Sequence, residues 1–354
     1  MVPGRQGGIM PLSVQPRSNP FQTFKRKGAT RMLKVYQLQN GGLKGSVVSE
    51  GGPIPADSLW LDLLNPTLDE RRAVDSLLGM ELPTRADMEE IEASSRLYQE
   101  DGGVFMTALI MSATDTERPV TDVVTFVLAR DKLITLRYID PQPFRTFAAR
   151  CDRSVVHLMK SEAVLMGLLD TIIDRMADVL ERVGQEVEST SREIFDPQVS
   201  GPRTRDFTDI LRRLGRKHDL TGKMRESLLT IARVITFLTQ AIEGKTNKDV
   251  KAHLKTLTRD VQSLQDHTSY LTSKISYLQD GTLGLINNEQ NNIIKIMSVA
   301  AMVFLPPTLF ASIWGMNFHF MPELDEAWGY PLSLAIMVVS AVLPYLFFKR
   351  RGWL

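Results

Sequence analysis

Residues 287–317 read NNEQNNIIKIMSVAAMVFLPPTLFASIWGMN, and this stretch decides the fold. No Asp, Glu, Lys or Arg occurs between 296 and 322, and a second run without acidic or basic residues covers 327–348. Each run exceeds the roughly 20 apolar residues that cross about 30 Å of hydrocarbon at about 1.5 Å per residue. The sequence therefore predicts two transmembrane helices near its C-terminal end, at 296–318 and 329–348.

Charged residues at the ends of these runs set the expected orientation. Lys295 precedes the first run, and the second is followed by a basic terminus at 349–354 that contains Lys349, Arg350 and Arg351. The connecting loop 319–328 has no Lys or Arg and carries Glu323, Asp325 and Glu326. By the positive-inside rule, we expect a multi-pass protein of the cell inner membrane, with both chain ends in the cytoplasm and the acidic loop outside.

Ahead of the spans, the sequence predicts a tail, a cytoplasmic α/β domain and long helices. Residues 1–31 are rich in Gly, Pro and basic residues and lack the apolar region of a signal peptide, so a disordered tail is expected there. Within an α/β domain over 32–150, short apolar runs predict strands at 32–38, 58–64, 104–113, 122–131 and 132–139. Capping-box spacing of Thr67 with Glu70 predicts a helix ending near Gly79, and a similar opening at Thr84 predicts another helix over 82–98. Residues 151–247 predict long cytoplasmic helices that are interrupted at 195–203 by two prolines and a glycine.

Residues 248–295 carry a heptad pattern. One seam consists of Val250, Leu257, Leu264, Leu271, Leu278 and Leu285, and the second of Leu254, Val261, Thr268, Ile275 and Thr282. Such a repeat predicts a stalk helix that packs lengthwise against other helices and runs directly into the first span. If it is continuous from 248 to 315, this helix is about 100 Å long.

The first predicted span has one face that a simple anchor would not need. At spacings of three and four residues, this face collects Asn291, Ile294, Ser298, Ala301, Leu305, Thr308 and Ser312. Polar groups inside a bilayer lie against another helix or against water, so we expect this face to point inward. Two helices cannot enclose an aqueous path, and a pore therefore requires several copies of the chain around an axis. The alternative is that Ser298, Thr308 and Ser312 only join helices to one another.

Several other functional classes are disfavoured by the sequence. The formal net charge is +1 and the charges are interspersed, so nucleic acid is not an expected partner. The single cysteine, Cys151, excludes an internal disulfide. There is no Walker loop, Rossmann fingerprint or nucleophile elbow, and the five histidines are scattered, so we expect no enzyme. Without a nucleotide motif, ion flow is expected to follow the electrochemical gradient.

Four short motifs near the C-terminus carry a resemblance to a known family. They are GMN at 315–317, MPEL at 321–324, GYP at 329–331 and KRRGWL at 349–354. Together with 286–312, they closely resemble the CorA family of magnesium transport proteins. The resemblance implies a funnel-like homopentameric channel in which the stalk helix continues into the pore-lining helix. It also implies Mg²⁺ as the transported ion, with Co²⁺ and Ni²⁺ as further cargo.

The resemblance also implies roles for individual residues. Gly315, Met316 and Asn317 would form a selectivity loop at the outer mouth, in which a ring of Asn317 holds a hydrated ion. Deeper rings would be formed by the polar Thr308 and Asn291 and by the apolar Leu305, Met297 and Ile294, while Ala301 and Ser312 share the predicted pore face. Regulatory Mg²⁺ would bind between cytoplasmic subunits at Asp87 and Asp266, with Asp260 as the alternative stalk residue.

The chemistry of these residues is consistent with that assignment. Mg²⁺ gives up its water reluctantly, and a ring of amide oxygens accepts hydrogen bonds from the bound waters without removing them. The acidic loop would raise the local cation concentration, and apolar rings can gate by dewetting. Two alternatives stay open: a zinc or other divalent-cation transporter of the same family, and a membrane-tethered coiled-coil scaffold or sensor.

Overall fold

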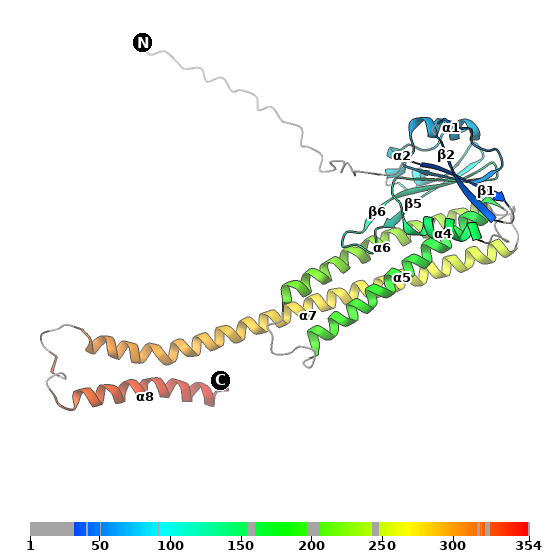
Figure 1. Cartoon of the computed structure of the whole chain (residues 1–354). Coiled ribbons are helices and arrows are strands. Elements are labelled where there is room, and N and C mark those ends of the chain that lie inside the picture. The colour runs from blue at the N-terminus through cyan, green and yellow to red at the C-terminus, as the bar shows by residue number, and fades with distance from the viewer. Residues whose placement is uncertain are drawn as a thin grey trace, which may run out of the picture.

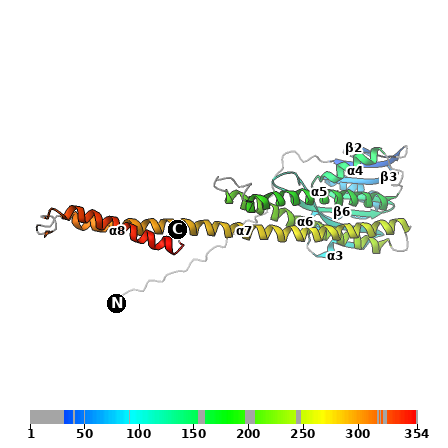
Figure 2. The same cartoon turned by 90° about the horizontal axis from the view of Figure 1, so that it is seen from below.

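The computed structural model describes residues 32–39, 42–49, 51–90, 92–153, 160–196, 206–242, 248–316, 319, 321–322 and 326–352. The expected tail at 1–31 lies outside these residues. An α/β domain occupies one end of the molecule, a long helix leads away from it, and a second helix folds back beside the far end of the first (Figure 1 and Figure 2).

The α/β domain is built on a seven-stranded sheet. Its strands are β1 (Met32–Gln39), β2 (Gly42–Val48), β3 (Ser58–Leu64), β4 (Leu97–Glu100), β5 (Gly103–Ser112), β6 (Val120–Ala129) and β7 (Lys132–Arg137). They lie in the order β2-β1-β3-β7-β6-β5-β4. The central β3 and β7 run parallel, and the other neighbours are antiparallel. All five predicted strands are present, whereas β2 and β4 were not predicted.

The first predicted helix is confirmed together with its caps. Helix α1 (Leu68–Leu78) begins after Thr67, whose N–H donates to Glu70 Oε2 over 2.7 Å while Thr67 Oγ1 accepts from the Glu70 N–H over 3.2 Å. It ends at Gly79 in the left-handed conformation, φ +68°, which glycine adopts without a Cβ penalty. This boundary could be read from local sequence because both caps are local interactions.

The prediction of one helix over 82–98 is wrong. Helix α2 (Arg85–Glu89) stops after five residues, because Glu90 turns to an extended conformation, φ −56° and ψ 141°. The short α3 (Ala93–Arg96) follows, and then β4 pairs with β5, with Leu97 opposite Met106. Strands β4 and β5 form a hairpin through the tight turn at Asp101 and Gly102, and this pairing overrides the helical pattern at 97–98.

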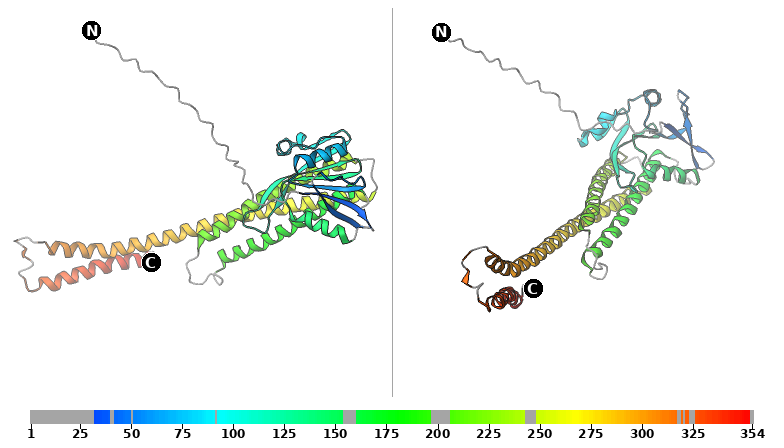
Figure 3. Two further views of the ribbon diagram at one scale, coloured as in Figure 1. Left: turned by 45° about the horizontal axis from the view of Figure 1, so that its top comes forward. Right: turned by 60° about the vertical axis from the view of Figure 1, so that its left-hand side comes forward.

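Helices cover both faces of the sheet. On one face, Val74 and Leu78 of α1 and Met88 of α2 pack with strand residues such as Leu61 and Val127. On the other face, α4 (Gln142–Arg153), α5 (Ser161–Phe195) and α6 (Phe207–Ala241) pack over Trp60 and Phe126. Figure 3 shows how α5 and α6 extend beyond the sheet along the long helix.

The stalk prediction is confirmed as one continuous helix. Helix α7 (Lys248–Trp314) has 67 residues, which corresponds to about 100 Å. Both heptad seams are buried or half-buried, and α7 packs against α5 and α6 of the same chain. Beyond these partners α7 continues alone until α8 (Gly329–Arg350) returns along it.

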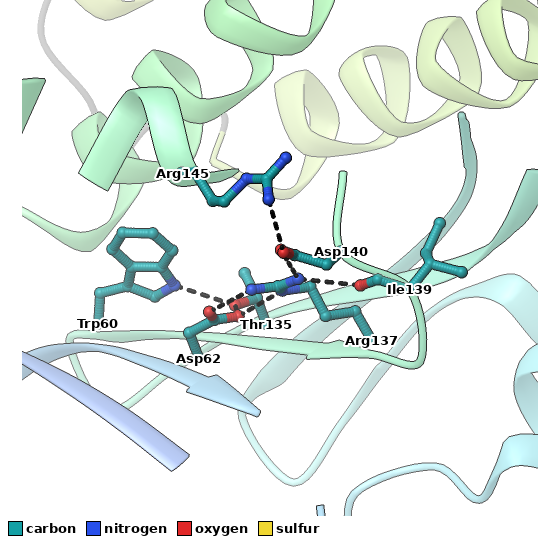
Figure 4. A network of polar contacts seen from close by, with 7 residues as sticks. All are labelled: Trp60, Asp62, Thr135, Arg137, Ile139, Asp140 and Arg145. Atoms are coloured by element: carbon teal, nitrogen blue, oxygen red, sulfur yellow. Dashed lines mark hydrogen bonds and ion pairs between the residues drawn. The ribbon is translucent and has the colours of Figure 1, made fainter. Parts of the chain in front are cut away.

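A buried polar network joins the two parallel strands (Figure 4). Asp62 of β3 accepts hydrogen bonds from Arg137 Nε at 2.9 Å, from Arg137 Nη2 at 2.8 Å and from Thr135 Oγ1 at 2.8 Å. Trp60 Nε1 donates to Thr135 Oγ1 over 3.0 Å, and Arg137 Nη1 donates to Asp140 Oδ1 over 2.8 Å. Burial alone would lower the pKa of Arg137, but the Asp62 carboxylate raises it above its usual value. Because its charges are paired in this way, the network can exist inside the domain.

Candidate ion pathway

Helix α8 covers one defined face of the membrane half of α7. The less exposed residues of α7 in this region recur every three or four positions and include Val299, Val303, Pro306, Phe310 and Trp314. Phe310 and Trp314 also stack, with ring centroids 5.7 Å apart. Because α8 is the element that packs against this half of α7, these residues mark the face that α8 covers.

Most of the predicted pore residues lie on the opposite side of α7. At about 100° per residue, Met297, Ala301, Leu305, Thr308 and Ser312 lie on the side away from α8, and all five are exposed. Asn291 and Ile294 are also exposed, and they line a groove to which Phe348 of α8 contributes. Ile294, Met297 and Leu305 are 62%, 68% and 66% exposed. Large apolar side chains that are this exposed on a helix with one partner must be covered by further copies, by lipid, or by both. The chain therefore leaves the predicted pore face free for assembly.

Thr308 can present an oxygen acceptor to this face. Its hydroxyl donates to the Phe304 carbonyl over 2.7 Å, so its proton is already used within the helix. The oxygen lone pairs stay available to accept hydrogen bonds from water, including water bound to a cation. Nearby, Pro306 and Pro307 have no N–H, so the Met302 and Val303 carbonyls receive no helical hydrogen bond from them.

The predicted selectivity loop begins where α7 ends. The Gly315 N–H donates to the Ala311 carbonyl over 2.9 Å, and the Met316 N–H donates to the Ile313 carbonyl over 3.3 Å. A Cβ at Gly315 would lie 3.0 Å from the Ala311 carbonyl oxygen, so the tight end of the helix favours glycine. Asn317 lies outside the described residues, as do Glu323 and Asp325. Glu326 is described and exposed.

The structure places Lys295 of α7 beside the basic C-terminal end of α8. A groove of about 440 Å³ is lined by Asn291, Ile294, Lys295, Ser298, Val299 and Met302 of α7 and by Phe348 of α8. Lys295 therefore lies at the end of α8 that carries Lys349 and Arg350. Sequence reasoning used Lys295 only to orient the chain and did not predict that it lines this groove.

The predicted regulatory acids are exposed and lie on different elements. Asp87 closes the cap of α2, where its Oδ2 accepts from the Thr84 N–H over 2.8 Å and its N–H donates to Thr84 Oγ1 over 3.3 Å. The hydrogen bond from the Thr84 backbone holds the pKa of Asp87 below its usual value. Asp266 accepts a 3.2 Å hydrogen bond from Gln262 of its own helix. Within the described part of the chain, no hydrogen bond or ion pair joins Asp87 to either stalk acid.

The alternative residue Asp260 lies in a different electrostatic environment. Asp170 of α5 contacts His253 of α7, with Asp170 Oδ2 and His253 Nε2 2.7 Å apart. Burial raises the pKa of Asp170; the pairing with His253 opposes this shift, and the carboxylates of Asp174 and Asp260 add to it. Asp260 therefore lies near the acidic residues of α5 in the same chain.

Comparison with known proteins identifies one family along most of the chain. The family described as CorA-like Mg²⁺ transporter protein matches residues 55–350. The chain is 35% identical over 323 residues to the magnesium transport protein CorA of Escherichia coli K12, covering 91% of this chain and all of that protein. For the protein of the same name from Yersinia pseudotuberculosis, the identity is 34% over the same shares.

Solved structures show the same fold. The complete structure of the CorA magnesium transporter from Methanocaldococcus jannaschii superposes with a TM-score of 0.71 at 18% identity, covering 92% of this chain and 98% of that one. The structure of the full-length CmaX protein gives a TM-score of 0.67 at 14% identity, covering 92% and 100%. The predicted arrangement of an α/β domain, a long helix and two C-terminal helices is thereby confirmed.

Proposed function

Because the chain belongs to the CorA-like Mg²⁺ transporter family, we propose that it transports Mg²⁺ across the cytoplasmic membrane through a pore formed by several copies of α7. The observation that carries this proposal is the free face of α7. Met297, Leu305 and Thr308 are exposed on the side that α8 does not cover, and two helices alone cannot enclose water. The family is one of transporters, and transport rather than catalysis is the activity proposed.

The proposed assembly is a homopentamer with α7 innermost and α8 outside. In this arrangement, Asn317 forms a ring at the outer mouth and accepts hydrogen bonds from the water shell of Mg²⁺. Thr308 repeats the same chemistry deeper in the pore, because its oxygen is free to accept. Ile294, Met297 and Leu305 form apolar constrictions that exclude water when they close.

The proposed topology places both chain ends in the cytoplasm and the loop at 319–328 outside. Lys295 and Phe348 line the same groove, so the basic residues of both helices gather on one side of the membrane. That distribution agrees with the positive-inside rule. Glu326, with Glu323 and Asp325, would then concentrate cations at the outer entrance.

Regulation is proposed to use cytoplasmic Mg²⁺ bridging Asp87 of one subunit and Asp266 of another. Two carboxylates that face each other repel until a divalent cation binds between them, so binding would hold the subunits together and close the pore. Asp260 is the alternative stalk residue. Co²⁺ and Ni²⁺ are proposed as further cargo, and Zn²⁺ is the alternative within the same family.

Flux into liposomes that contain the purified protein tests this function. Uptake of Mg²⁺, Co²⁺, Ni²⁺ and Zn²⁺ is compared in one preparation, with Asn317→Ala as the variant of the mouth. We expect Mg²⁺ uptake in the wild-type protein and a loss of selective uptake in the variant. Absence of ion flux would favour the membrane-tethered scaffold, and undiminished selective flux in Asn317→Ala would refute the proposed mouth.

A matched pair of isoleucines tests the proposed pore face. Ile294 and Ile296 are 62% and 66% exposed, but they point to opposite sides of α7. We expect Ile294→Ser to hydrate a constriction and raise Mg²⁺ leak when cytoplasmic Mg²⁺ is high, whereas Ile296→Ser leaves the leak near the wild-type level. Equal leaks in the two variants would mean that Ile294 does not line the pathway.

A further inference from the structure

The turn between β5 and β6, residues 113–119, reaches from the sheet onto two long helices. Asp115 is its central contact. Asp115 Oδ2 lies 2.6 Å from Arg175 Nη2, and Asp115 Oδ1 lies 2.5 Å from Arg182 Nη1. Arg175 and Arg182 are seven residues apart on α5 and therefore share a face. One carboxylate thus binds the same helix face at two points that are about two turns apart.

A second pair of basic residues holds the turn from α6. Arg216 Nη1 lies 2.8 Å from Glu117 Oε1, and Lys223 Nζ donates to the Pro119 carbonyl over 3.3 Å. These residues are also seven apart. The turn is therefore held between basic side chains of α5 and α6, at positions that are 60 or more residues away in sequence.

The turn itself has a fixed shape. Ala113 adopts φ +56°, a left-handed conformation that costs a non-glycine residue about 1 kcal/mol or more. The Ala113 carbonyl accepts hydrogen bonds from the Thr116 N–H over 3.0 Å and from Thr116 Oγ1 over 2.8 Å. Such strain persists only where the surroundings hold the backbone. The contacts to α5 and α6 supply that support.

Charge rather than close packing holds the turn in place. A cleft of about 390 Å³ lies beside it, lined mainly by polar side chains that include Glu117, Arg182, Arg216 and Lys217. The Asp115 side chain is 56% exposed. The hydrogen bond from Arg182 holds the pKa of Asp115 below its usual value, so the carboxylate stays charged at cytoplasmic pH. Because exposed ion pairs add little to global stability, Asp115 can be replaced without unfolding the protein.

The same turn is joined to the proposed regulatory helix. Strand β6 begins at Val120, directly after the turn. Helix α2, which carries Asp87, packs against β6, and Arg85 Nη2 lies 3.5 Å from Asp122 Oδ2 on that strand. A continuous set of contacts thus leads from α2 through β6 and the turn to α5, and α5 packs along α7.

We propose that Asp115 is a positioning residue that couples the Mg²⁺-binding region of the α/β domain to helix α5. The proposal rests on the regulatory part of the proposed function. Helix α6 has a second attachment to the sheet, because Ser227 Oγ donates to the Leu109 carbonyl over 2.6 Å. Loss of Asp115 should therefore affect α5 more than α6.

Hydrogen exchange of the full chain in lipid nanodiscs, with and without Mg²⁺, tests the coupling without relying on transport. In the wild-type protein, we expect Mg²⁺ to slow exchange both at 85–100 and in α5. In Asp115→Asn, the slowing at 85–100 should persist, while α5 exchanges at least about threefold faster than in the Mg²⁺-bound wild-type protein. Asp115→Glu keeps the carboxylate and should restore the slow exchange.

Glu193→Gln is the matched control. Glu193 pairs with Arg213 of α6 over 2.7 Å and lies eleven residues beyond Arg182 on α5, so its loss should leave the response of α5 to Mg²⁺ intact. Equal slowing of α5 in wild type and Asp115→Asn, or no response of α5 in wild type, would overturn the coupling. A failure of Mg²⁺ flux with the exchange pattern intact would instead refute the proposed transport and leave the coupling standing.

Discussion

Removing Asp62 should destabilise the cytoplasmic domain far more than removing a surface carboxylate. Asp62 and Arg137 have side chains that are 3% and 5% exposed. In Asp62→Ala, Arg137 Nε and Nη2 lose their acceptors, and only its Nη1 keeps the Ile139 carbonyl and Asp140. Breaking a buried pair in this way costs about 3–5 kcal/mol, because the buried Arg137 charge loses Asp62 and keeps only the partly exposed Asp140 as an ionic partner.

The expected shift in melting temperature follows from this cost. For a unit of about 150–250 residues, each kcal/mol lowers the melting temperature by about 2–4 °C, so Asp62→Ala should lose about 6–20 °C. The measurement is thermal unfolding of the full chain in detergent, followed by near-ultraviolet circular dichroism, because Trp60 donates a hydrogen bond within the network. Asp69→Ala is the control, since Asp69 and its partner Arg72 are 87% and 76% exposed.

The double replacement Asp62→Leu with Arg137→Met tests the source of the lost stability. The loss comes either from leaving Arg137 buried without Asp62 or from the absence of the ion pair itself. Replacing both charges of a buried pair with apolar groups is often nearly neutral, so the double variant should regain most of the lost stability. The reasoning would be refuted by an Asp62→Ala variant that melts within 2 °C of Asp69→Ala. It would also be refuted by a double variant that loses the sum of the two single effects.

Three further predictions follow from local geometry. A Cβ at Gly281 would lie 2.8 Å from Phe195 Cζ, whereas nothing lies within 4 Å of one at Gly284. Gly284→Ala should therefore raise the free energy of unfolding by about 1 kcal/mol through helix propensity, and the melting temperature with it. Gly281→Ala should raise the melting temperature less. The opposite order would contradict the Phe195 contact. Asp87 has a lowered pKa, so its capping contribution should be constant from about pH 7 to 5 and be lost only as the pH falls through that lowered pKa. The melting difference between wild type and Asp87→Ala measures this, and a difference that has vanished by about pH 6 would contradict it. Replacing Glu323, Asp325 and Glu326 with Gln should slow uptake at low Mg²⁺ and weaken its salt dependence, and an unchanged salt dependence would show that the loop does not concentrate cations.

The parts of the fold that could be predicted depend on local patterns. The α1 caps involve residues three and four apart, and the heptad repeat of α7 needs only its own sequence. Strand β4 was missed because the helix that begins after Thr84 was extended through 98, although Asp101 and Gly102 form a tight turn that joins β4 to β5. The hydrogen bonds between Asp62 and Arg137 join positions 75 residues apart, and those between Asp115 and Arg182 join positions 67 apart. Periodicity in the sequence cannot predict contacts between positions that are so far apart.

For the site, periodicity could identify a face of α7 but not what lies against each side. That depends on where α8 returns, which is a tertiary contact. The role of Met297 came from a family resemblance rather than from spacing, yet its 68% exposure is comparable to that of Ile294 and Leu305. The sequence also left open which helices pack against the stalk helix, and in the structure α7 packs against α5 and α6 of its own chain. Heptads therefore do not by themselves indicate a coiled coil between copies here.

The position of α8 bears directly on the alternative that polar residues of the first span only join helices. If Ser298 and Thr308 joined α7 to α8, they would lie on the covered face. That face instead carries Val299, Val303 and Phe310, while Thr308 is exposed on the other side and Ser298 is exposed in the groove that Phe348 of α8 also lines. Any helix-joining role for Thr308 must therefore act between copies of the chain, on the same face that carries Leu305. An assembly that buries this face around an axis brings those side chains into rings, and ion flux then distinguishes a conducting pore from a closed scaffold.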